Sequence, residues 1–368
     1  MSIHVEDVEF IGYVGLRDFS ETRPARGPAV DVNYIETVAK AHELSGFDRA
    51  LVAFHSTLAE SILVSQHVAS VTKKLGLMVA HRPGFTAPTV AARQFATLDQ
   101  LSGGRAAVHI ITGGDDQELK QDGDHLTKDE RYARTSEYLD IVKQEWTSEK
   151  PFSYQGKYYQ IENAFSTVKS VQPPHIPVYF GGASDAAIAV AGKHADIYAL
   201  WGETQAQVRE VTSRVSAAAA KHNRRPRFSL SFRPILADTE EKAWKRADEI
   251  LEQARAVLSA TGYARTKEPV NSGSLRLLEA AKQGTRLDKR LWTAIAALTG
   301  AKGNSTALVG TPEQVAEAFL DYYDLGVTTF LIRGFDPLDD AIDYGRELIP
   351  LTRKLVSQRK RIAGVAAE

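Results

Sequence analysis

Two glycine-containing turns follow runs of strand-forming residues, and both have the composition of an anion site. Ala106–Ile111 leads into Thr112-Gly113-Gly114, and Val178–Phe180 leads into Gly181-Gly182-Ala183-Ser184. Glycine lets backbone N–H groups approach an anion, and a helix N-terminus such as the one expected at Ser184–Asp185 stabilises phosphate. The alternative is that these glycines only make tight turns between strand and helix. The residues alone leave both interpretations open.

Cationic and aromatic side chains stand where three later strands are expected to end. Trp201 follows Ile197–Leu200, Arg233 lies near the end of Phe228–Pro234, and Arg333 follows Thr328–Ile332. A guanidinium group binds oxyanions through paired hydrogen bonds, so we expect Arg233 and Arg333 to hold one anionic group and Trp201 to wall the site. For each arginine the alternative is a buried ion pair. His81 is a further candidate, and its alternative is a structural hydrogen bond.

Composition narrows the class of protein. The chain has 368 residues, a net charge of −1 and no cysteine, which excludes disulfides, thiolate catalysis and thiolate metal sites. A near-neutral balance argues against a nucleic-acid partner, and no apolar run has the length of a membrane span. The N-terminus carries no secretory signal pattern. We therefore expect a cytoplasmic enzyme without a metal centre.

The elements that must position these residues alternate between strand and helix. The expected strands are Val8–Val14, Ala50–Ala53, Gly76–Ala80, Ala106–Ile111, Val178–Phe180, Ile197–Leu200, Phe228–Pro234 and Thr328–Ile332. The expected helices are Val30–Leu44, Ala59–Leu75, Ala87–Leu101, Lys128–Ser148, Asp185–Lys193, Gln205–His222, Glu240–Ala260, Pro312–Leu325 and Leu338–Lys360. Such alternation predicts an α/β fold, a TIM (β/α)8 barrel, with an open doubly wound sheet as the alternative.

Two segments interrupt the alternation. Phe152–Ile161 has the pattern of a hairpin turning at Gln155-Gly156, and Thr261–Ser305 is longer than a normal barrel connection. Long insertions at the C-terminal face of a barrel commonly form lids or binding loops. We predict one domain over residues 1–368, with a lid-like insertion at about 261–305.

Several long runs, in order along the chain, resemble the bacterial luciferase-like flavin monooxygenases. They are LMVAHRPGFTAPTVAARQFATLDQLSGGR from Leu77, AAVHIITGGDDQE from Ala106, DERY from Asp129, PHIPVYFGGASDAA from Pro174, WGE from Trp201 and TALVG from Thr306. The pattern is most similar to the alkanesulfonate monooxygenase branch, and the resemblance extends from Phe10 to Pro350.

The resemblance implies that the chain binds reduced FMN. Thr112, Gly113, Tyr132 and Ser184 then lie where the family holds the ribityl chain and phosphate, and Ala183 adds a backbone N–H. Asp185 is expected to cap its helix, because a carboxylate is a poor neighbour for phosphate. Arg93 and Arg105 are expected to form ion pairs that tie the barrel together.

The chain departs from the sulfonate pattern in the substrate region. Ser231 replaces an arginine, Arg233 stands two residues on at a histidine position, and Arg333 and Phe335 replace a small residue and a tyrosine. Alternate strand residues share a face, so positive charge is kept but moved along it. A polar set would suit a hydroxylated sulfonate such as sulfoquinovose; its members are His55, Ser56, Thr57, His81 and Ser231.

The family implies a two-component system. A separate NAD(P)H-dependent flavin reductase supplies reduced FMN, and O2 oxygenates an organosulfonate to release sulfite and an aldehyde. A homodimer or homotetramer is typical of the resemblance. The alternatives are a deazaflavin-dependent oxidoreductase on the same barrel and a non-catalytic flavin-binding homologue.

Overall fold

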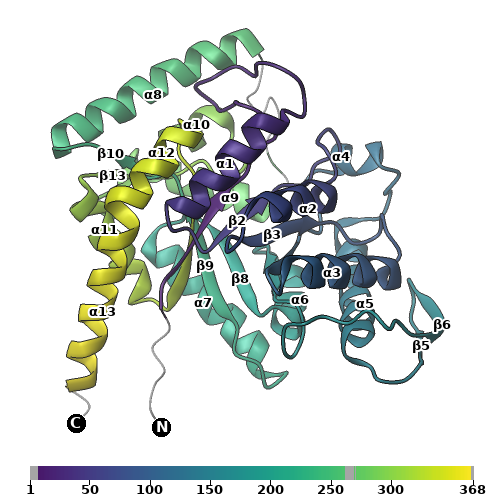
Figure 1. Ribbon diagram of the computed structural model, residues 1–368. Helices are drawn as coiled ribbons and strands as arrows, with labels where there is room; N and C mark the ends of the chain where they lie inside the picture. Colours follow the sequence, from purple (N-terminus) through teal and green to yellow (C-terminus); the bar gives the residue numbers. More distant parts are fainter. Residues whose placement is uncertain (1–6, 262–268, 270, 366–368) are drawn as a thin grey trace. The chain divides into compact units, whose positions relative to one another are not determined.

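A closed barrel of parallel strands lies at the centre of the fold (Figure 1). The computed structural model describes residues 7–261, 269 and 271–365. The strand order around the barrel is β1-β14-β9-β8-β7-β4-β3-β2. The bounds are β1 Glu9–Tyr13, β2 Arg49–Val52, β3 Gly76–His81, β4 Ala106–Ile110, β7 Val178–Gly181, β8 Ile197–Trp201, β9 Arg227–Phe232 and β14 Val327–Ile332. The predicted TIM barrel is confirmed, and each predicted barrel strand is present within about two residues at its ends.

Helices follow the barrel strands as expected. They are α1 Val32–Leu44, α2 Ser61–Val71, α3 Pro88–Ser102, α5 Lys128–Thr147, α6 Asp185–His194, α7 Gln205–Ala220, α8 Glu240–Thr261, α11 Pro312–Tyr323, α12 Pro337–Asp343 and α13 Ile349–Val365. The last predicted helix is interrupted by a π-helical segment, Tyr344–Leu348. The predicted hairpin is also present, as β5 Phe152–Gln155 paired antiparallel with β6 Gln160–Ala164.

Sequence reasoning missed several short elements. α4 (Asp116–Gln121) follows β4, and α9 (Ser272–Gln283) and α10 (Ala294–Thr299) lie in the long insertion. A second, four-stranded sheet has the order β10-β13-β12-β11, with bounds Ile235–Leu236, Ala307–Gly310, Leu291–Trp292 and Arg286–Leu287. The insertion predicted at 261–305 therefore contains regular structure. Part of that predicted lid, residues 262–268 and 270, lies outside the described residues.

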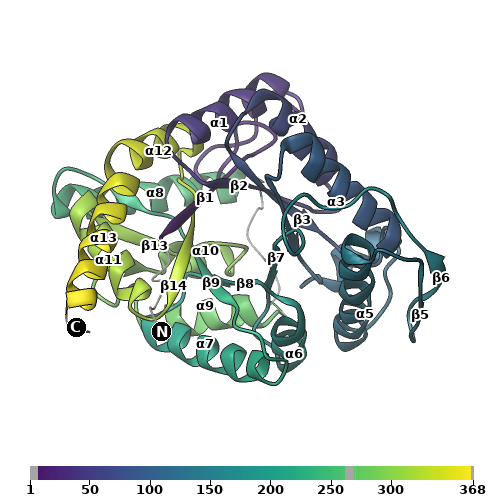
Figure 2. The ribbon, with the colours of Figure 1, turned by 60° about the horizontal axis from the view of Figure 1, so that its bottom comes forward.

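Packing divides the chain into two compact units, which we describe separately. Unit 1 comprises the described residues up to Arg49, Leu200–Thr212 and those from Arg227 onwards. In its core Phe10 of β1 lies beside Phe330 of β14, and both rings pack on Phe319 of α11. Helices α11 and α13 pack against each other, as Figures 1 and 2 both show. This apolar layer between strands and helices buries one face of each strand.

Unit 2 comprises Ala50–Ala199 and Ser213–Pro226. Helices α3 and α5 pack side by side, and the indole N–H of Trp146 donates to the carbonyl of Ala92 at 2.8 Å. Arg93 forms the expected ion pair, 3.9 Å from Glu145. Arg105 also has structural contacts, but through hydrogen bonds to main-chain carbonyl oxygens, among them those of Leu75 and Ser102. Both arginines therefore support the fold of unit 2.

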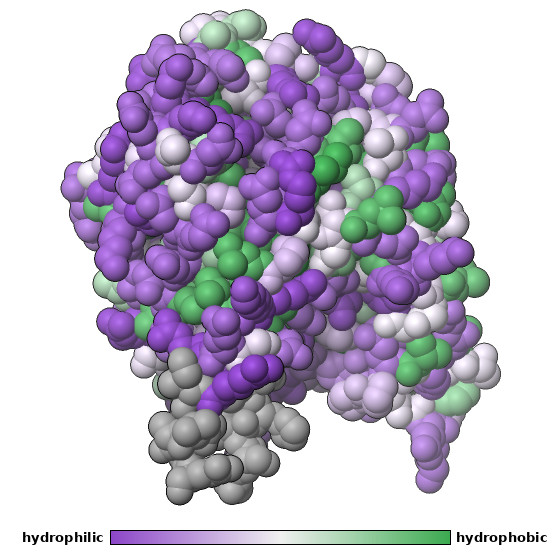
Figure 3. All heavy atoms as spheres, turned by 60° about the vertical axis from the view of Figure 1, so that its left-hand side comes forward, coloured by the Kyte–Doolittle hydropathy of each residue, from purple (hydrophilic) through white to green (hydrophobic). Residues whose placement is uncertain are grey.

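Polar side chains predominate on the face seen in Figure 3, where hydrophobic residues form small separate groups. Within residues 7–261, 269 and 271–365, no helix is both long and apolar enough to cross a membrane.

Candidate functional site

The turn between β7 and α6, in unit 2, has the geometry of a phosphate site. Ser184 is the N-cap of α6, and its Oγ accepts a hydrogen bond from the N–H of Ala187 at 3.3 Å. The N–H groups of a first helical turn point out of the helix, and the helix dipole favours a negative charge there. The prediction that Asp185 caps this helix is wrong. Asp185 is the first helical residue and forms an exposed ion pair with Arg214 at 2.6 Å.

Gly182 lets the backbone of this turn pack closely against α6 and Tyr132. Gly182 has φ +132°, and a Cβ built on it would lie 2.9 Å from the Cβ of Ala187 and 3.0 Å from the hydroxyl of Tyr132. Tyr132 is buried, and burial raises the pKa of its phenol although a hydrogen bond with Ser184 acts against the shift. The phenol therefore stays protonated at neutral pH and can donate to an anion. These features of Gly182, Tyr132 and Ser184 fit an FMN phosphate.

The turn after β4 carries the other two predicted cofactor residues. Thr112 is buried, with its hydroxyl 3.4 Å from that of Thr135 on α5. Gly113 has φ +101°, and a Cβ there would lie 2.7 Å from a methyl group of Leu119. The positive φ favours glycine here, and any larger residue would also have to push the Leu119 side chain aside. The structure thus places all five predicted cofactor residues in unit 2: Thr112 and Gly113 lie on the turn after β4, Ala183 and Ser184 on the turn after β7, and Tyr132 on α5.

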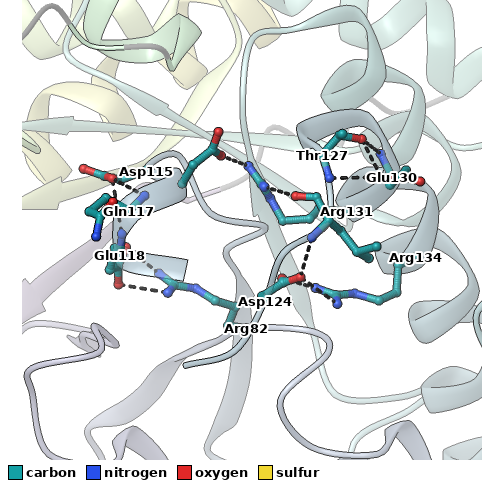
Figure 4. A network of polar contacts seen from close by, with 11 residues as sticks. Arg82, Asp115, Gln117, Glu118, Asp124, Thr127, Glu130, Arg131 and Arg134 are labelled. Carbon is teal, nitrogen blue, oxygen red and sulfur yellow. Dashed lines mark hydrogen bonds and ion pairs between the residues drawn. The ribbon is translucent and has the colours of Figure 1, made fainter. Parts of the chain in front are cut away.

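Three arginines fix the segment that follows this turn (Figure 4). Arg82 binds Glu118 through two hydrogen bonds of 2.8 and 3.2 Å. Arg131 lies 2.7 Å from Asp116, and Arg134 lies 2.6 Å from Asp124. Both partners are largely buried in the Arg82–Glu118 and Arg134–Asp124 pairs, so these two pairs are screened less than surface pairs. The pairs hold α4 and its flanking loops in one position beside Thr112.

His81 faces the helices of unit 2. Its Nε2 lies 2.6 Å from the hydroxyl of Tyr138 on α5, and its ring packs edge-on against Phe95 on α3. Burial lowers the pKa of His81 to about 4. His81 is therefore neutral at pH 7 and has a structural hydrogen bond, and its catalytic role stays a prediction.

His109 is a candidate that sequence reasoning missed. It pairs in register with Ala80 of β3 and Tyr179 of β7. Because Ala80 is next to His81, these paired residues point away from the helices that His81 contacts, into the barrel. The Nδ1 of His109 is buried and finds no hydrogen-bond partner in the described part of the chain. The sequence does carry a signal for His109, because it is a polar residue within the apolar run Ala106–Ile111.

The predicted polar set has members in both units. In unit 2, His55 and Thr57 are exposed and their side chains lie 2.9 Å apart. The Ser56 hydroxyl donates to Gln121 of α4 at 2.7 Å. These three residues stabilise a loop of unit 2, and the lining of one pocket by the whole set stays a prediction. Ser231 lies in unit 1.

The two predicted substrate arginines converge on one carboxylate in unit 1. Arg233 is fully buried, with Nη1 2.6 Å from Glu21, and the Nη2 of Arg333 lies 2.9 Å from the other oxygen of Glu21. Arg233 also stacks 3.6 Å above the ring of Phe335, and Arg333 lies 5.0 Å from the ring of Tyr13. The ion pair that was the alternative for each arginine is present. Two cations and one anion leave this cluster with one positive charge.

Glu21 itself had no sequence signal. It lies in the loop after β1, far along the chain from both arginines. Burial opposes its ionisation, but the neighbouring Arg233 and Arg333 outweigh burial and lower the pKa of its carboxyl to about 2. The carboxylate is therefore charged at all physiological pH values.

Trp201, the last residue of β8, also lies in unit 1. It packs against the buried side chains of Leu277, Ala296 and Ala301 from the long insertion. The next residue, Gly202, accepts a hydrogen bond from the hydroxyl of Thr306 at 2.7 Å, and the carbonyl of Thr306 accepts from the N–H of Arg233 at 3.0 Å. Thr306 thus links the ends of β8 and β9. Of the four residues predicted for catalysis, Trp201, Arg233 and Arg333 lie in unit 1 and His81 lies in unit 2.

No cluster of three or more His, Asp or Glu side chains suited to a metal ion occurs in the described ranges.

Comparison with known proteins gives one family. A family model described as luciferase-like monooxygenase matches residues 14–329. Among solved structures, a riboflavin lyase with modified FMN and riboflavin has a TM-score of 0.78 at 18% identity, covering 95% of this chain and 92% of that one. An EDTA monooxygenase from Chelativorans sp. BNC1 has a TM-score of 0.76 at 20% identity, covering 95% and 94%. A coenzyme F420-dependent tetrahydromethanopterin reductase from Methanopyrus kandleri has a TM-score of 0.68 at 19% identity, covering 94% and 99%. At these identities the structural matches bear on the fold.

Proposed function

Because the chain belongs to the luciferase-like monooxygenase family, we propose that it is an FMNH2-dependent monooxygenase that cleaves the carbon–sulfur bond of an organosulfonate. The observation that carries this choice of substrate is the Arg233–Glu21–Arg333 cluster of unit 1, in which two guanidinium groups surround one carboxylate.

The charge of the cluster favours a monoanionic substrate group. Two guanidinium groups stand around one carboxylate, and such a pair of cations attracts an anionic group. A sulfonate has a single negative charge at neutral pH and three acceptor oxygens in a geometry that guanidinium groups bind well. The side chain of Arg333 is 25% exposed, whereas Arg233 is fully buried. Arg333 is thus the accessible cation, and Glu21, which also pairs with Arg233, holds it in position.

FMN is the cofactor we propose, held by the turns at Thr112-Gly113 and Gly182–Ser184. Reduced FMN, when bound, supplies two electrons to O2. In the overall reaction the carbon–sulfur bond breaks, sulfur leaves with its electron pair as sulfite, and the carbon forms a carbonyl bond to one oxygen atom. The second oxygen atom leaves as water, and the other two electrons come from the carbon. The chain's own contribution is to bind the phosphate, hold the sulfonate and exclude water.

This proposal includes partners. A separate NAD(P)H-dependent reductase must regenerate FMNH2, and O2 is the second substrate. The oligomeric state, a homodimer or homotetramer, remains a prediction.

Sulfite release tests the proposal against its alternatives. The purified chain is mixed with a sulfonate panel, O2 and either FMNH2 or reduced F420. Sulfite with FMNH2 alone supports the proposal. Substrate-dependent hydride transfer with reduced F420 would establish the deazaflavin alternative. FMN binding without turnover of any sulfonate would favour the non-catalytic homologue.

A further inference from the structure

Strand β9 has a polar face that points away from the helices of unit 1. Phe232 packs against Tyr322 and Phe319 of α11, with ring centroids 5.0 and 6.2 Å apart. Since alternate residues of a strand face opposite sides, Ser231 and Arg233 face the barrel interior. Ser231 is 6% exposed, and its hydroxyl has no hydrogen-bond partner among the residues that the structure describes. A buried hydroxyl is thus left without a partner two residues from Arg233.

A second unsatisfied group lies on the segment between α10 and β13. The side chain of Asn304 has both its amide nitrogen and its carbonyl oxygen buried, and neither has a partner within the described ranges. Asn304 is two residues before Thr306, whose backbone and hydroxyl bind Arg233 and Gly202. Two residues span at most about 7 Å, so Asn304 lies close to the ends of β8 and β9.

Unsatisfied buried polar groups are uncommon in folded proteins and each one lowers stability. A ligand bound near the Arg233–Glu21–Arg333 cluster would supply partners for this hydroxyl and this amide. Both groups can donate and accept, and neither is charged. The matching ligand part has neutral groups that also donate and accept, which is the chemistry of alcohols and not of an alkyl chain.

We propose that Ser231 and Asn304 are specificity-determining residues that bind hydroxyl groups on the organic part of the substrate. This inference rests on the proposed sulfonate function for the identity of the anionic end. The substrate class is thus a hydroxylated sulfonate, with its charged end at Arg333 and its hydroxyl groups at Ser231 and Asn304.

The first test needs no substrate. Asn304→Leu removes the amide at nearly constant volume, and the Tm of the variant should stay level or rise by about 2 °C, because a group without partners is lost. The matched variant is Asn271→Leu, since the Asn271 carbonyl accepts a hydrogen bond from the N–H of Ser274 at 2.8 Å and caps α9. That variant should have a lower Tm. If Asn304→Leu lowers the Tm as much as Asn271→Leu does, Asn304 is structural and the inference is overturned.

The second test compares substrates. Sulfoquinovose and hexane-1-sulfonate are assayed for sulfite release with wild type, Asn304→Leu and Ser231→Ala. Each substitution should lower kcat/KM for sulfoquinovose by about tenfold, the effect of one lost hydrogen bond, and leave hexane-1-sulfonate unchanged. Equal effects on both substrates would overturn the inference while leaving the sulfonate function intact. If no sulfonate releases sulfite, the proposed function fails, and the Tm comparison alone decides whether Asn304 is a ligand-binding residue.

Discussion

Ser184 offers a sharp test of where the FMN phosphate binds. Ser184→Asp keeps the helix cap, since aspartate is as good an N-cap as serine, but it puts a negative charge in the first turn of α6. Ser184→Asn is the matched control, because asparagine has the same size and also caps a helix. The two variants therefore differ in charge and not in the local fold.

The expected magnitude follows from the geometry of the turn. The Ser184 Oγ lies 3.3 Å from the N–H nitrogen of Ala187, among the groups that would bind the phosphate. A carboxylate about 5 Å from the phosphate, at an effective dielectric constant of about 20, repels it by about 3 kcal/mol per unit charge. Ser184 is only half-buried, so solvent screening reduces this effect. We expect Ser184→Asp to weaken FMN binding by about 30- to 100-fold relative to Ser184→Asn.

Flavin fluorescence titration measures this difference, first with FMN and then with riboflavin, which has no phosphate. The charge should weaken FMN binding and leave riboflavin binding nearly unchanged. If the dissociation constants of the Asp and Asn variants for FMN agree within about threefold, the phosphate does not bind at the N-terminus of α6 and our reasoning is refuted.

Three further predictions follow from the other contacts. Arg333→Gln should raise the KM for the sulfonate by about tenfold or more without changing the Kd of FMN. The control is Arg346→Gln, which removes an arginine from an exposed ion pair. If the two variants have equal KM values in steady-state sulfite assays, Arg333 does not bind the sulfonate. Gly182→Ala introduces a Cβ 2.9 Å from that of Ala187 at φ +132°, so urea unfolding should show a loss of about 1–3 kcal/mol, and an unchanged midpoint would disprove the strain. Folding lowers the pKa of His81 from 6.5 to about 4. Between these pH values the unfolded chain binds a proton at His81 and the folded chain does not, so the free energy of unfolding falls as the pH falls from 6.5 towards 4. In His81→Gln the number of protons taken up on unfolding should fall by up to one in that pH range, so the free energy of unfolding should depend less on pH. Urea unfolding at pH 7, 6 and 5 measures this dependence.

Local signals in the sequence predicted most of the barrel. Strand runs such as Gly76–Ala80 are apolar because parallel barrel strands are buried on both faces. The start of α11 is marked by Thr311 as its N-cap and Pro312 in its first turn. Both signals depend on neighbouring residues, so they are readable without the fold. The two glycine turns were found for the same reason.

Short elements were missed because their stability comes from distant partners. Strand β13, Ala307–Gly310, pairs with β10 on one side and β12 on the other, and each of those partners has two residues. Such strands have too few residues for a periodic pattern to appear. The helices α9 and α10 lie in a segment whose polar composition suggested a loop.

The sequence by itself determined the α/β barrel, the two glycine turns and the presence of arginines at strand ends, because periodicity, turn chemistry and residue type are local properties. Only the tertiary structure decided what those arginines contact. Glu21 meets Arg233 and Arg333 across more than two hundred residues of chain, and a buried charge is stable only with such a partner. The unsatisfied groups of Ser231, Asn304 and His109 are likewise properties of burial. Whether a polar atom is buried and has a partner depends on every segment packed around it, and that information is not local in the sequence.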